Sequence, residues 1–598
     1  MPARPNSARQ AKAGTSDPIE LALEETNGGR PGREAAYVLL DRQARLIGWQ
    51  IAGERMGVAL KVLGGLVGLL AALLFGSMVF NAARSKAVVV QALDTPPSLA
   101  EQGLSGRVVA GKLQDGLTLI QATTRATAKG RAIANAWTGD IAVEVAQTGV
   151  SIGEVDRLLR ERLGRNTYVS GDLVQTPDGR IALTVRGGSI LARTFTGPRE
   201  SIDDLARQAA EYIYGEAEPY LYATYLNQND RSAEVIPFAQ RALASAEAAE
   251  RAPLANTTGL AYSNVGSSES AVQWYRLAIQ YDPTFWRSWG NLVGELLMPG
   301  TEEEAYRVGQ QMIAANESST TTHANRSDQA NVYLLTQDWP AYVEGTIEDA
   351  VQTGGLGTTT VITANPSIAE GEARRHDWAA AARYMALADP SDALSAPTGQ
   401  LIWAYRAIEE RRFGDAVTLL EPFHAAWMTD EDLAFTYHDA PCWLALAYDL
   451  TGQRTKAREI YDQMGALVTC YALQADGVEA TGDRVAADAA YRRAIALAPS
   501  IPFAYQRRAV ALMRRGEFKM AAGRFRDAHQ RGPNWADPLK GWGDALAAQG
   551  LWARAVEKYE QAEPLAPNWR DLHLAHAVAS DRLGRGREAA AVRRKLAG

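Results

Sequence analysis

Four glycines near the C-terminal end of the chain, Gly482, Gly516, Gly550 and Gly584, follow one another at intervals of 34 residues. An alanine stands five residues after each glycine, and further size matches follow it. These matches are Ala487, Ala521, Ala555 and Ala589, then Tyr491, Phe525 and Tyr559, then Ala494, Ala528 and Ala562, then Pro499, Pro533 and Pro567. Residue sizes recur while the residues between them vary, so this part of the chain repeats one structural unit.

Each recurring size has a mechanical reason in a pair of antiparallel helices. Glycine allows a sharp turn between the helices. Alanine lets the helices approach closely, the aromatic ring fills the gap beside it, and proline ends the second helix because it cannot continue the hydrogen-bond ladder. The same frame occurs earlier, from Gly266 to Pro283, and continues at Gly300 and Ala305. The period and these sizes resemble the tetratricopeptide repeat.

The resemblance implies a mainly α-helical solenoid over residues 226–598, with about eight or nine repeats stacked around a concave face. The segment from 313 to 366 fits the period poorly. In this family, first-helix residues line the concave face and hold an extended peptide or a helix of a partner protein. The candidate groove contacts are Asp476, Glu479, Gln506, Arg514, Lys540 and Asp544. Their mixed charges argue against a nucleic-acid groove, and solvated polar side chains would give the same pattern.

An apolar run near the start of the chain predicts a membrane anchor. Residues Val62 to Phe80 contain no charge and are long enough to cross a bilayer at about 1.5 Å per residue. The run starts too far from Met1 for a cleaved signal peptide, so we expect a transmembrane helix over 57–81, with a buried core helix as the alternative. Flanking basic residues are more frequent before it (Arg42, Arg45, Arg55 and Lys61) than after it (Arg84 and Lys86). This bias places the N-terminus in the cytoplasm, and in a Gram-negative bacterium it places the later domains in the periplasm, anchored to the inner membrane.

Small residues follow one face of the predicted anchor. Gly64, Gly68, Ala72 and Gly76 recur every four positions. Such a ribbon lets two helices pack closely, which would give a homodimer. Glycine is also common in membrane helices that do not associate, so both alternatives stay open.

The remaining N-terminal segments differ in composition. Residues 1–32 are polar and predict a disordered cytoplasmic tail, and residues 33–56 predict a juxtamembrane helix. Residues 86–225 predict a small α/β domain with a mixed sheet, in the order β-α-β-α-β-β-β-α, including a strand at 140–146, a helix at 151–164 and a hairpin turn at Asp178-Gly179. This order, with "LAEQGLSGRVVAGKL" and "VSGDLVQTPDGRIALTV", resembles the TolB-like N-terminal domain of membrane-anchored bacterial tetratricopeptide-repeat proteins.

No catalytic, cofactor or metal motif stands out, so we expect no enzyme. The chain has no phosphate-binding loop and no CxxC, and its net charge of −7 offers no footprint for nucleic acid. His573 and His576 could share a metal, but their place in the repeat frame favours packing. His438, Asp439 and Cys442 could suggest a nucleophile, but no oxyanion donor accompanies them.

The chain has two cysteines, Cys442 and Cys470, at nearly equivalent places on the first helices of successive repeats. In an oxidising compartment they could form a disulfide, and free buried thiols are the alternative. Taken together, the sequence predicts a membrane-anchored scaffold for protein partners on the extracytoplasmic side. A membrane sensor, in which the α/β domain binds a ligand and signals through dimer repacking, is the second hypothesis.

Overall fold

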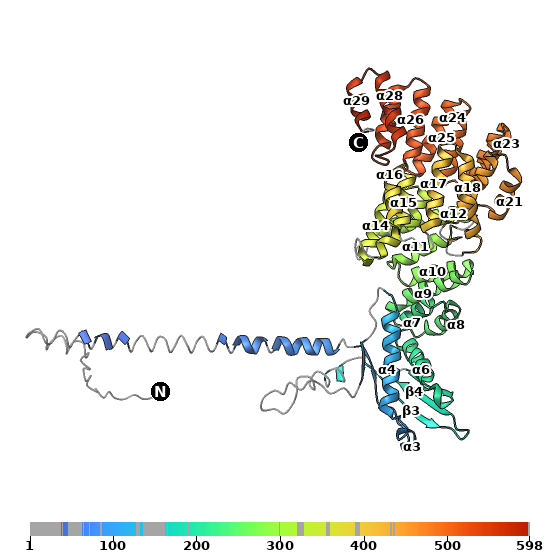
Figure 1. Ribbon diagram of the computed structural model, residues 1–598. Coiled ribbons are helices and arrows are strands. Elements are labelled where there is room, and N and C mark those ends of the chain that lie inside the picture. Colours follow the sequence, from blue (N-terminus) through green and yellow to red (C-terminus); the bar gives the residue numbers. More distant parts are fainter. Residues whose placement is uncertain are drawn as a thin grey trace, which may run out of the picture. The chain divides into compact units, whose positions relative to one another are not determined.

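The computed structural model describes most of residues 86–595 of the chain (Figure 1). Within that range it leaves out 127–131, most of 136–165, 189, 298–299, most of 320–327, 355–358, 389–394, 431–432 and 435–436. Before residue 86 it describes parts of 37–45 and of 62–83. The chain forms two compact units, one of Met1–Gln114 with Arg131–Ile202 and one of Asp115–Gly130 with Asp203–Gly598.

The first unit contains a mixed five-stranded sheet with the order β2-β1-β3-β4-β5. Its strands are β1 (Ala87–Val90), β2 (Ala132–Asn135), β3 (Thr167–Gln175), β4 (Ile181–Gly187) and β5 (Ile190–Gly197). β1 runs parallel to β2 and β3, and it is buried along its whole length, as its unbroken valine run predicts. β3, β4 and β5 are antiparallel. The predicted mixed sheet is therefore present.

Helices and turns of this region agree with the predicted order where the structure describes them. β1 is followed by α3 (Pro97–Ala100) and α4 (Gly106–Thr123), and the short helix η2 (Arg199–Ser201) follows β5. Gly179 has φ of 81° in the turn between β3 and β4, where glycine is favoured. The strand β2 was not predicted. The strand predicted at 140–146 and most of the helix predicted at 151–164 lie outside the described residues.

One helix of the described chain, Gly65–Ala83, is long and apolar enough to cross a membrane. It has 19 residues and a mean hydropathy of 2.1. Residues 37–45 are helical where they are described, and residues 1–36 and 46–61 lie outside the described part.

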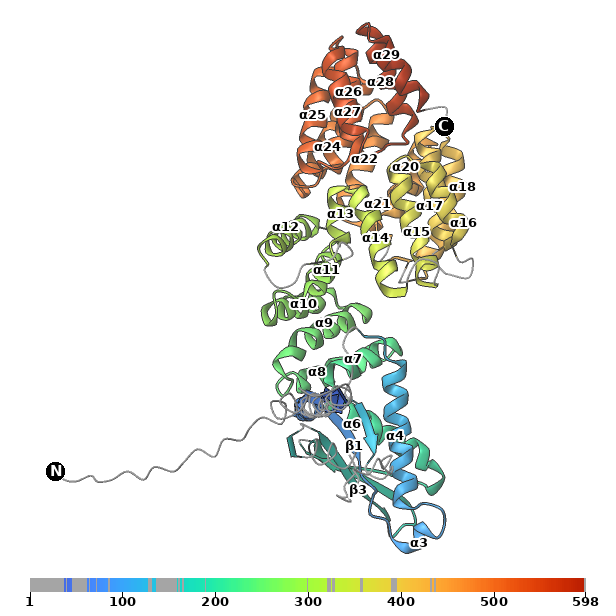
Figure 2. The ribbon, with the colours of Figure 1, turned by 90° about the vertical axis from the view of Figure 1, so that its left-hand side faces the viewer.

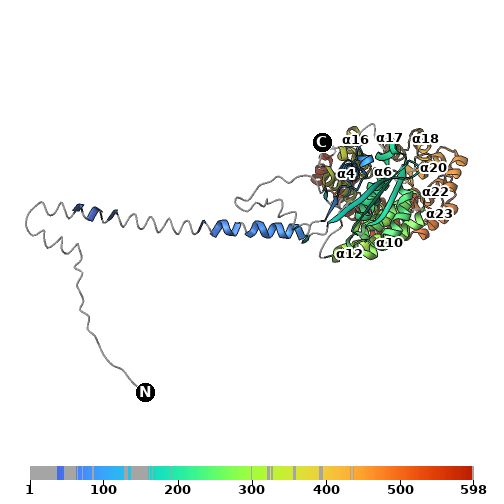
Figure 3. The ribbon, with the colours of Figure 1, turned by 90° about the horizontal axis from the view of Figure 1, so that it is seen from below.

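The second unit is helical, and its helices follow one another as hairpins (Figure 2). They are α6 (Ile202–Ala217), α7 (Pro219–Gln228), α8 (Ser232–Ala242), α9 (Ala248–Asn264), α10 (Ser268–Tyr281), α11 (Trp286–Glu295), α12 (Glu302–Ser318), α13 (Ala330–Thr336), α14 (Trp339–Gly354), α15 (Thr359–Arg374), α16 (Trp378–Leu387), α17 (Ser395–Glu409), α18 (Phe413–Trp427), α20 (Ala440–Leu450), α21 (Arg454–Met464), α22 (Val468–Ala480), α23 (Arg484–Leu497), α24 (Phe503–Arg514), α25 (Phe518–Arg531), α26 (Ala536–Ala548), α27 (Trp552–Ala562), α28 (Arg570–Arg582) and α29 (Gly586–Arg594). First helices of neighbouring hairpins also pack together, as α20 does on α22 (Figure 3).

The hairpin of α24 and α25 shows why the repeat keeps its sizes. Gly516 lies between the helices with φ of 78°, a conformation that strains other residues. Ala521 is fully buried and Phe525 is 2% exposed, so both lie in the seam. A Cβ atom on Gly541 of the next first helix would come within 2.4 Å of the Phe525 ring. The predicted hairpin geometry is confirmed.

Candidate functional site

The second unit turns back on itself, so that repeats far apart in sequence lie side by side. Three side-chain hydrogen bonds join residues 191 to 197 positions apart. They run from Ser500 to Glu303 (2.7 Å), from Asn534 to Asp338 (2.6 Å) and from Asn568 to Asp377 (2.6 Å). The backbone N–H of Ser500 also donates to Glu303, at 3.0 Å. We call this set the closing contacts.

The closing contacts follow from the repeat itself. Ser500, Asn534 and Asn568 are 34 residues apart, and each comes directly after the proline that ends a second helix. Their acceptors lie at the other edge of earlier repeats, close to the turn between the two helices of each hairpin. The donors therefore recur at the repeat spacing on one edge, the acceptors recur about once per hairpin on another, and the closing contacts join the two edges.

A buried histidine reinforces the same junction. The ring of His376 stacks on Trp569 with centroids 3.7 Å apart. Its Nε2 lies 3.3 Å from Asp537 and its Nδ1 lies 3.3 Å from Glu409. Burial alone would lower the pKa of His376, but the two carboxylates outweigh burial and raise the pKa to about 10. A cation therefore joins the turn between α15 and α16 to α17, α26 and α28.

Glu302 makes a further link at the start of α12. Its carboxylate accepts hydrogen bonds from the backbone N–H of Val468 (2.8 Å), the first residue of α22, and of Gly300 (3.2 Å). The carboxylate thus satisfies an N–H group that has no partner within its own helix. Burial raises the pKa of Glu302 to about 7.

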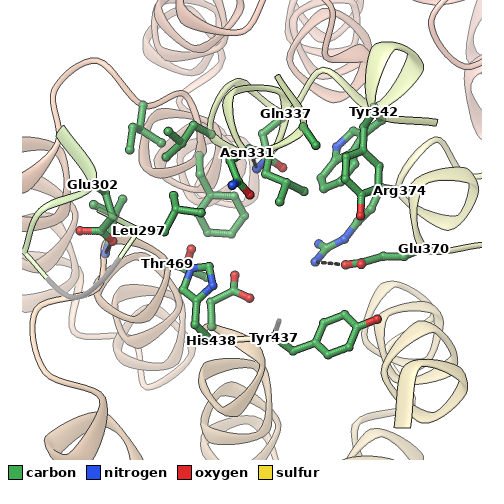
Figure 4. A pocket seen from close by; sticks show the side chains of 18 of the residues that line it. Leu297, Glu302, Asn331, Gln337, Tyr342, Glu370, Arg374, Tyr437, His438 and Thr469 are labelled. Carbon is green, nitrogen blue, oxygen red and sulfur yellow. Dashed lines mark hydrogen bonds and ion pairs between the residues drawn. The ribbon is translucent and has the colours of Figure 1, made fainter. Parts of the chain in front are cut away.

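The closed turn surrounds a cavity of about 300 Å³ (Figure 4). Its wall draws on α11, α12, α13, α14, α15, α20, α22 and α24. Aromatic side chains make up much of the wall: Trp339, Tyr342, Tyr437, Trp443 and Phe503. Polar residues complete it: Glu302, Asn331, Gln337, Ser367, Glu370, Arg374, His438, Asp439 and Thr469.

Arg374 at the end of α15 is the central cation of this cavity. Its guanidinium carbon lies 3.7 Å from the ring centroid of Tyr405 and 5.4 Å from those of Trp339 and Trp443. Figure 4 shows the guanidinium directed into the cavity beside Glu370, and the closest N–O distance of that pair is 3.7 Å. Burial opposes the charge, but the surrounding groups raise the pKa of Arg374, so it stays a cation. Burial also raises the pKa of Glu370.

Two N–H donors of the cavity wall lack a hydrogen-bond partner among the described residues. They are Nε of Arg374 and Nε1 of Trp443, and both atoms are buried. An unsatisfied buried donor costs about 1–3 kcal/mol. Neither nitrogen exposes surface to the cavity, so an acceptor supplied by a bound molecule would remove this cost only after the two side chains rotate toward it.

The predicted groove contacts lie outside this cavity. Asp476 is buried and accepts a hydrogen bond of 2.5 Å from Tyr491, and it is ion-paired with Arg507. The other five residues are placed as follows: Glu479 pairs with Arg515, Lys540 pairs with Asp544 at 2.8 Å, Gln506 is buried and Arg514 is exposed. A contact of any of them with a partner stays a prediction.

Residues of the cavity were missed by the sequence analysis, with one partial exception. His438 and Asp439, considered there as members of a nucleophile cluster, do line the cavity. Cys442 instead faces Cys470 of α22, with Cα atoms 5.0 Å apart, and the structure joins the two sulfurs in a disulfide. A sulfur in that bond is not a nucleophilic thiolate.

The small-residue ribbon of the apolar helix is described in part. Gly64 lies outside the described residues, while Gly68, Ala72 and Gly76 are helical. A Cβ atom at Gly68 or at Gly76 would meet no described atom within 4 Å. Packing of this face against a second copy stays a prediction.

Comparison with known proteins adds a sequence match to this geometry. Residues 254–285, which cover most of α9 and all of α10, match the family model "Tetratricopeptide repeat". The helical unit is a solenoid of tetratricopeptide repeats. Repeats of this kind support a scaffold for protein–protein interaction. A search of curated proteins found no match.

Solved structures with a similar fold of the chain match this protein with low TM-scores. A chain of the APC/C hetero-tetramer Cut9-Hcn1 is 13% identical, with a TM-score of 0.36 over 66% of this chain and 83% of its own length. Yeast Tom70 is 11% identical, with a TM-score of 0.30 over 62% of this chain and 89% of its own. MamA AMB-1 is 18% identical, with a TM-score of 0.22 over 26% of this chain and 94% of its own length. At these scores none of them carries an argument about what the cavity holds.

Proposed function

We propose that this protein is a membrane-anchored scaffold that grips a peptide segment of a partner protein on the extracytoplasmic side. The observation that carries the proposal is the cavity inside the tetratricopeptide-repeat solenoid, with its aromatic wall and its two unpartnered N–H donors, on Arg374 and Trp443. The proposed function is binding, with recognition of the peptide by shape and hydrogen bonds.

A peptide in extended conformation supplies the hydrogen-bond acceptors that this cavity lacks. It presents a backbone carbonyl about every 3.3 Å, and a rotation of the Arg374 or Trp443 side chain would let Nε or Nε1 donate to one of these carbonyls. Its apolar side chains would contact the rings of Trp339, Tyr342 and Phe503. A cavity of about 300 Å³ is at the lower end of ligand sites, which fits a few residues of a partner and not a whole helix.

Observations other than the cavity support the membrane anchor and the extracytoplasmic location of the solenoid. The helix Gly65–Ala83 has the length and hydropathy of a membrane span. The excess of basic residues before it favours a cytoplasmic N-terminus. A disulfide between Cys442 and Cys470 fits an oxidising compartment, such as the periplasm, for the solenoid.

Affinity capture with the full chain tests the proposal. Trp443→Phe removes one donor and keeps an aromatic ring, and Thr469→Phe fills the cavity. We expect each substitution to reduce recovery of partner proteins at least fivefold, since a lost hydrogen bond of about 1 kcal/mol already gives about fivefold. Mass spectrometry of the captured proteins measures the recovery.

Trp542→Phe is the matched control, because Trp542 lies on α26 and does not line the cavity. It should capture the same proteins as the unchanged chain. Circular dichroism of all variants checks that the helices remain folded. Equal capture by all three variants, or recovery of the bait alone, would show that the cavity is not the binding site.

A further inference from the structure

We propose that the hairpin of α28 and α29, together with α27, carries a binding site for a divalent transition-metal cation, with Zn²⁺ as its occupant. The ligands are Glu560 on α27, His576 on α28 and Glu588 on α29. One ligand atom from each lies within 4.8 Å of the others. The site belongs to a different part of the solenoid from the cavity and does not depend on the proposed function.

The separation of two of the ligand atoms suits a tetrahedral metal. Nε2 of His576 lies 3.3 Å from Oε1 of Glu588. Bonds of about 2.0–2.2 Å to a tetrahedral zinc place two ligand atoms roughly 3.3–3.5 Å apart. Glu560 is exposed, so its side chain can turn to complete the set. Three protein ligands leave the fourth position to water.

Both inner ligands have the supporting partners that metal ligands have in proteins. Nδ1 of His576 lies 2.7 Å from Oε1 of Glu563, so an Nδ1–H donates to a carboxylate and leaves the lone pair of Nε2 for a metal. The hydroxyl of Ser580 donates to Oε1 of Glu588 at 2.7 Å. Lys595 in turn holds the other oxygen of Glu563, at 2.6 Å. His576 is 3% exposed, so this arrangement is built into the packing.

The neighbouring histidine does not take part. Nε2 of His573 lies 2.7 Å from the backbone carbonyl of Pro567, and its Nδ1 lies 3.4 Å from Oε1 of Glu563, so neither nitrogen faces the three ligands. His573 is 2% exposed and fills a packing position, as the repeat frame predicts. The two histidines spaced three residues apart therefore have different roles.

Without a metal, a proton on Nε2 of His576 would bridge to Glu588 instead. Arg585 lies 3.5 Å from the other oxygen of Glu588 and competes for the same carboxylate. The experiment must therefore distinguish a cation held by three side chains from a protonated histidine between two carboxylates.

Isothermal titration of the full chain, without a polyhistidine tag, with Zn²⁺ measures the site. We expect one ion bound per chain with a Kd in the micromolar range. Glu560→Gln and Glu588→Gln should each weaken binding at least tenfold. Ser580→Ala, which removes only the supporting hydroxyl, should weaken it about tenfold. Co²⁺ in place of Zn²⁺ should give the strong visible absorption of a tetrahedral centre.

Glu557→Gln is the matched control, because Glu557 is exposed on the same helix one turn before Glu560 and is not part of the ligand set. Its Kd should stay within twofold of that of the unchanged chain. Glutamine keeps the size of glutamate, so these variants should fold. Absence of zinc binding up to about 1 mM, or equal binding by Glu560→Gln and Glu557→Gln, would overturn the site.

Discussion

In three successive repeats, the identity of the buried aromatic residue varies together with that of the residue 15 positions before it. Tyr491 donates to Asp476 at 2.5 Å, and Tyr559 donates to Asp544 at 2.9 Å. In the repeat between them the aromatic residue is Phe525, and Val510 stands at the position of the aspartate. A buried hydroxyl needs an acceptor, whereas a phenyl ring needs an apolar neighbour. The two aspartates therefore stabilise the interior of their own repeats, whether or not a partner is bound.

Asp476 and Asp544 occupy the same place in the repeat but differ in burial, which predicts different costs for their removal. Asp476 is 2% exposed and pairs with Arg507, while Asp544 is 29% exposed and pairs with Lys540. Asp476→Ala leaves a buried guanidinium unpaired and should cost about 3–5 kcal/mol. Asp544→Ala should cost about 1–2 kcal/mol, mostly for the tyrosine hydroxyl. Urea midpoints of the two variants measure this difference in stability. Equal shifts would contradict the different structural roles of Asp476 and Asp544.

The pair Cys442 and Cys470 acts between elements, because it joins first helices of adjacent hairpins. Labelling of the denatured full chain with a maleimide should modify no cysteine without reductant and two after reduction. The closed loop spans 28 residues, so the bond should stabilise the folded state by about 3–4 kcal/mol. Cys442→Ser with Cys470→Ser should lower the urea midpoint accordingly. Two labelled thiols without reductant would exclude the bond and weaken the case for an oxidising compartment.

The hairpins could be predicted most clearly where the turn keeps its glycine, and the repeat signal is weaker where another residue takes its conformation. Gly482, Gly516, Gly550 and Gly584 all have positive φ in such turns. Gln337, His376 and Arg411 have φ of 59° to 61° at the corresponding turns of earlier repeats. These residues adopt a left-handed conformation less readily than glycine and signal it less clearly, so the period fades there although the hairpins remain.

At the scale of the whole molecule, the solenoid was predictable and its closure was not. Each repeat adds a small rotation, and the sum decides which distant edges meet. Arg374 and Arg375 are neighbours with the same chemistry, yet Arg374 lines the cavity and Arg375 donates to the carbonyl of Leu565 at 3.1 Å. The roles of Arg374 and Arg375 differ only through contacts with residues far apart in the sequence. The cavity therefore cannot be predicted from the sequence of a single repeat.

The closed turn should respond to pH through His376. The pKa of this buried histidine is raised to about 10, against 6.5 for an ordinary histidine. Its stabilising effect is therefore complete below about pH 6.5, where the unfolded chain is also protonated, and is lost as pH rises toward 10. His376→Gln removes the charge at every pH. The free energies of unfolding of the unchanged chain and of this variant, from urea titrations, should differ most at pH 6, by a few kcal/mol, and converge near pH 10.

His529→Gln is the matched control for this titration, because burial lowers the pKa of His529 and keeps it neutral above pH 7. Its midpoint should differ from that of the unchanged chain by the same amount from pH 7 to pH 10. A pH-independent difference for His376→Gln as well would mean that no cation holds α15 and α16 against α26 and α28. In that case the closing contacts, the bond from Val468 to Glu302 and the bond from Arg375 to Leu565 would keep the turn closed to the same extent at every pH.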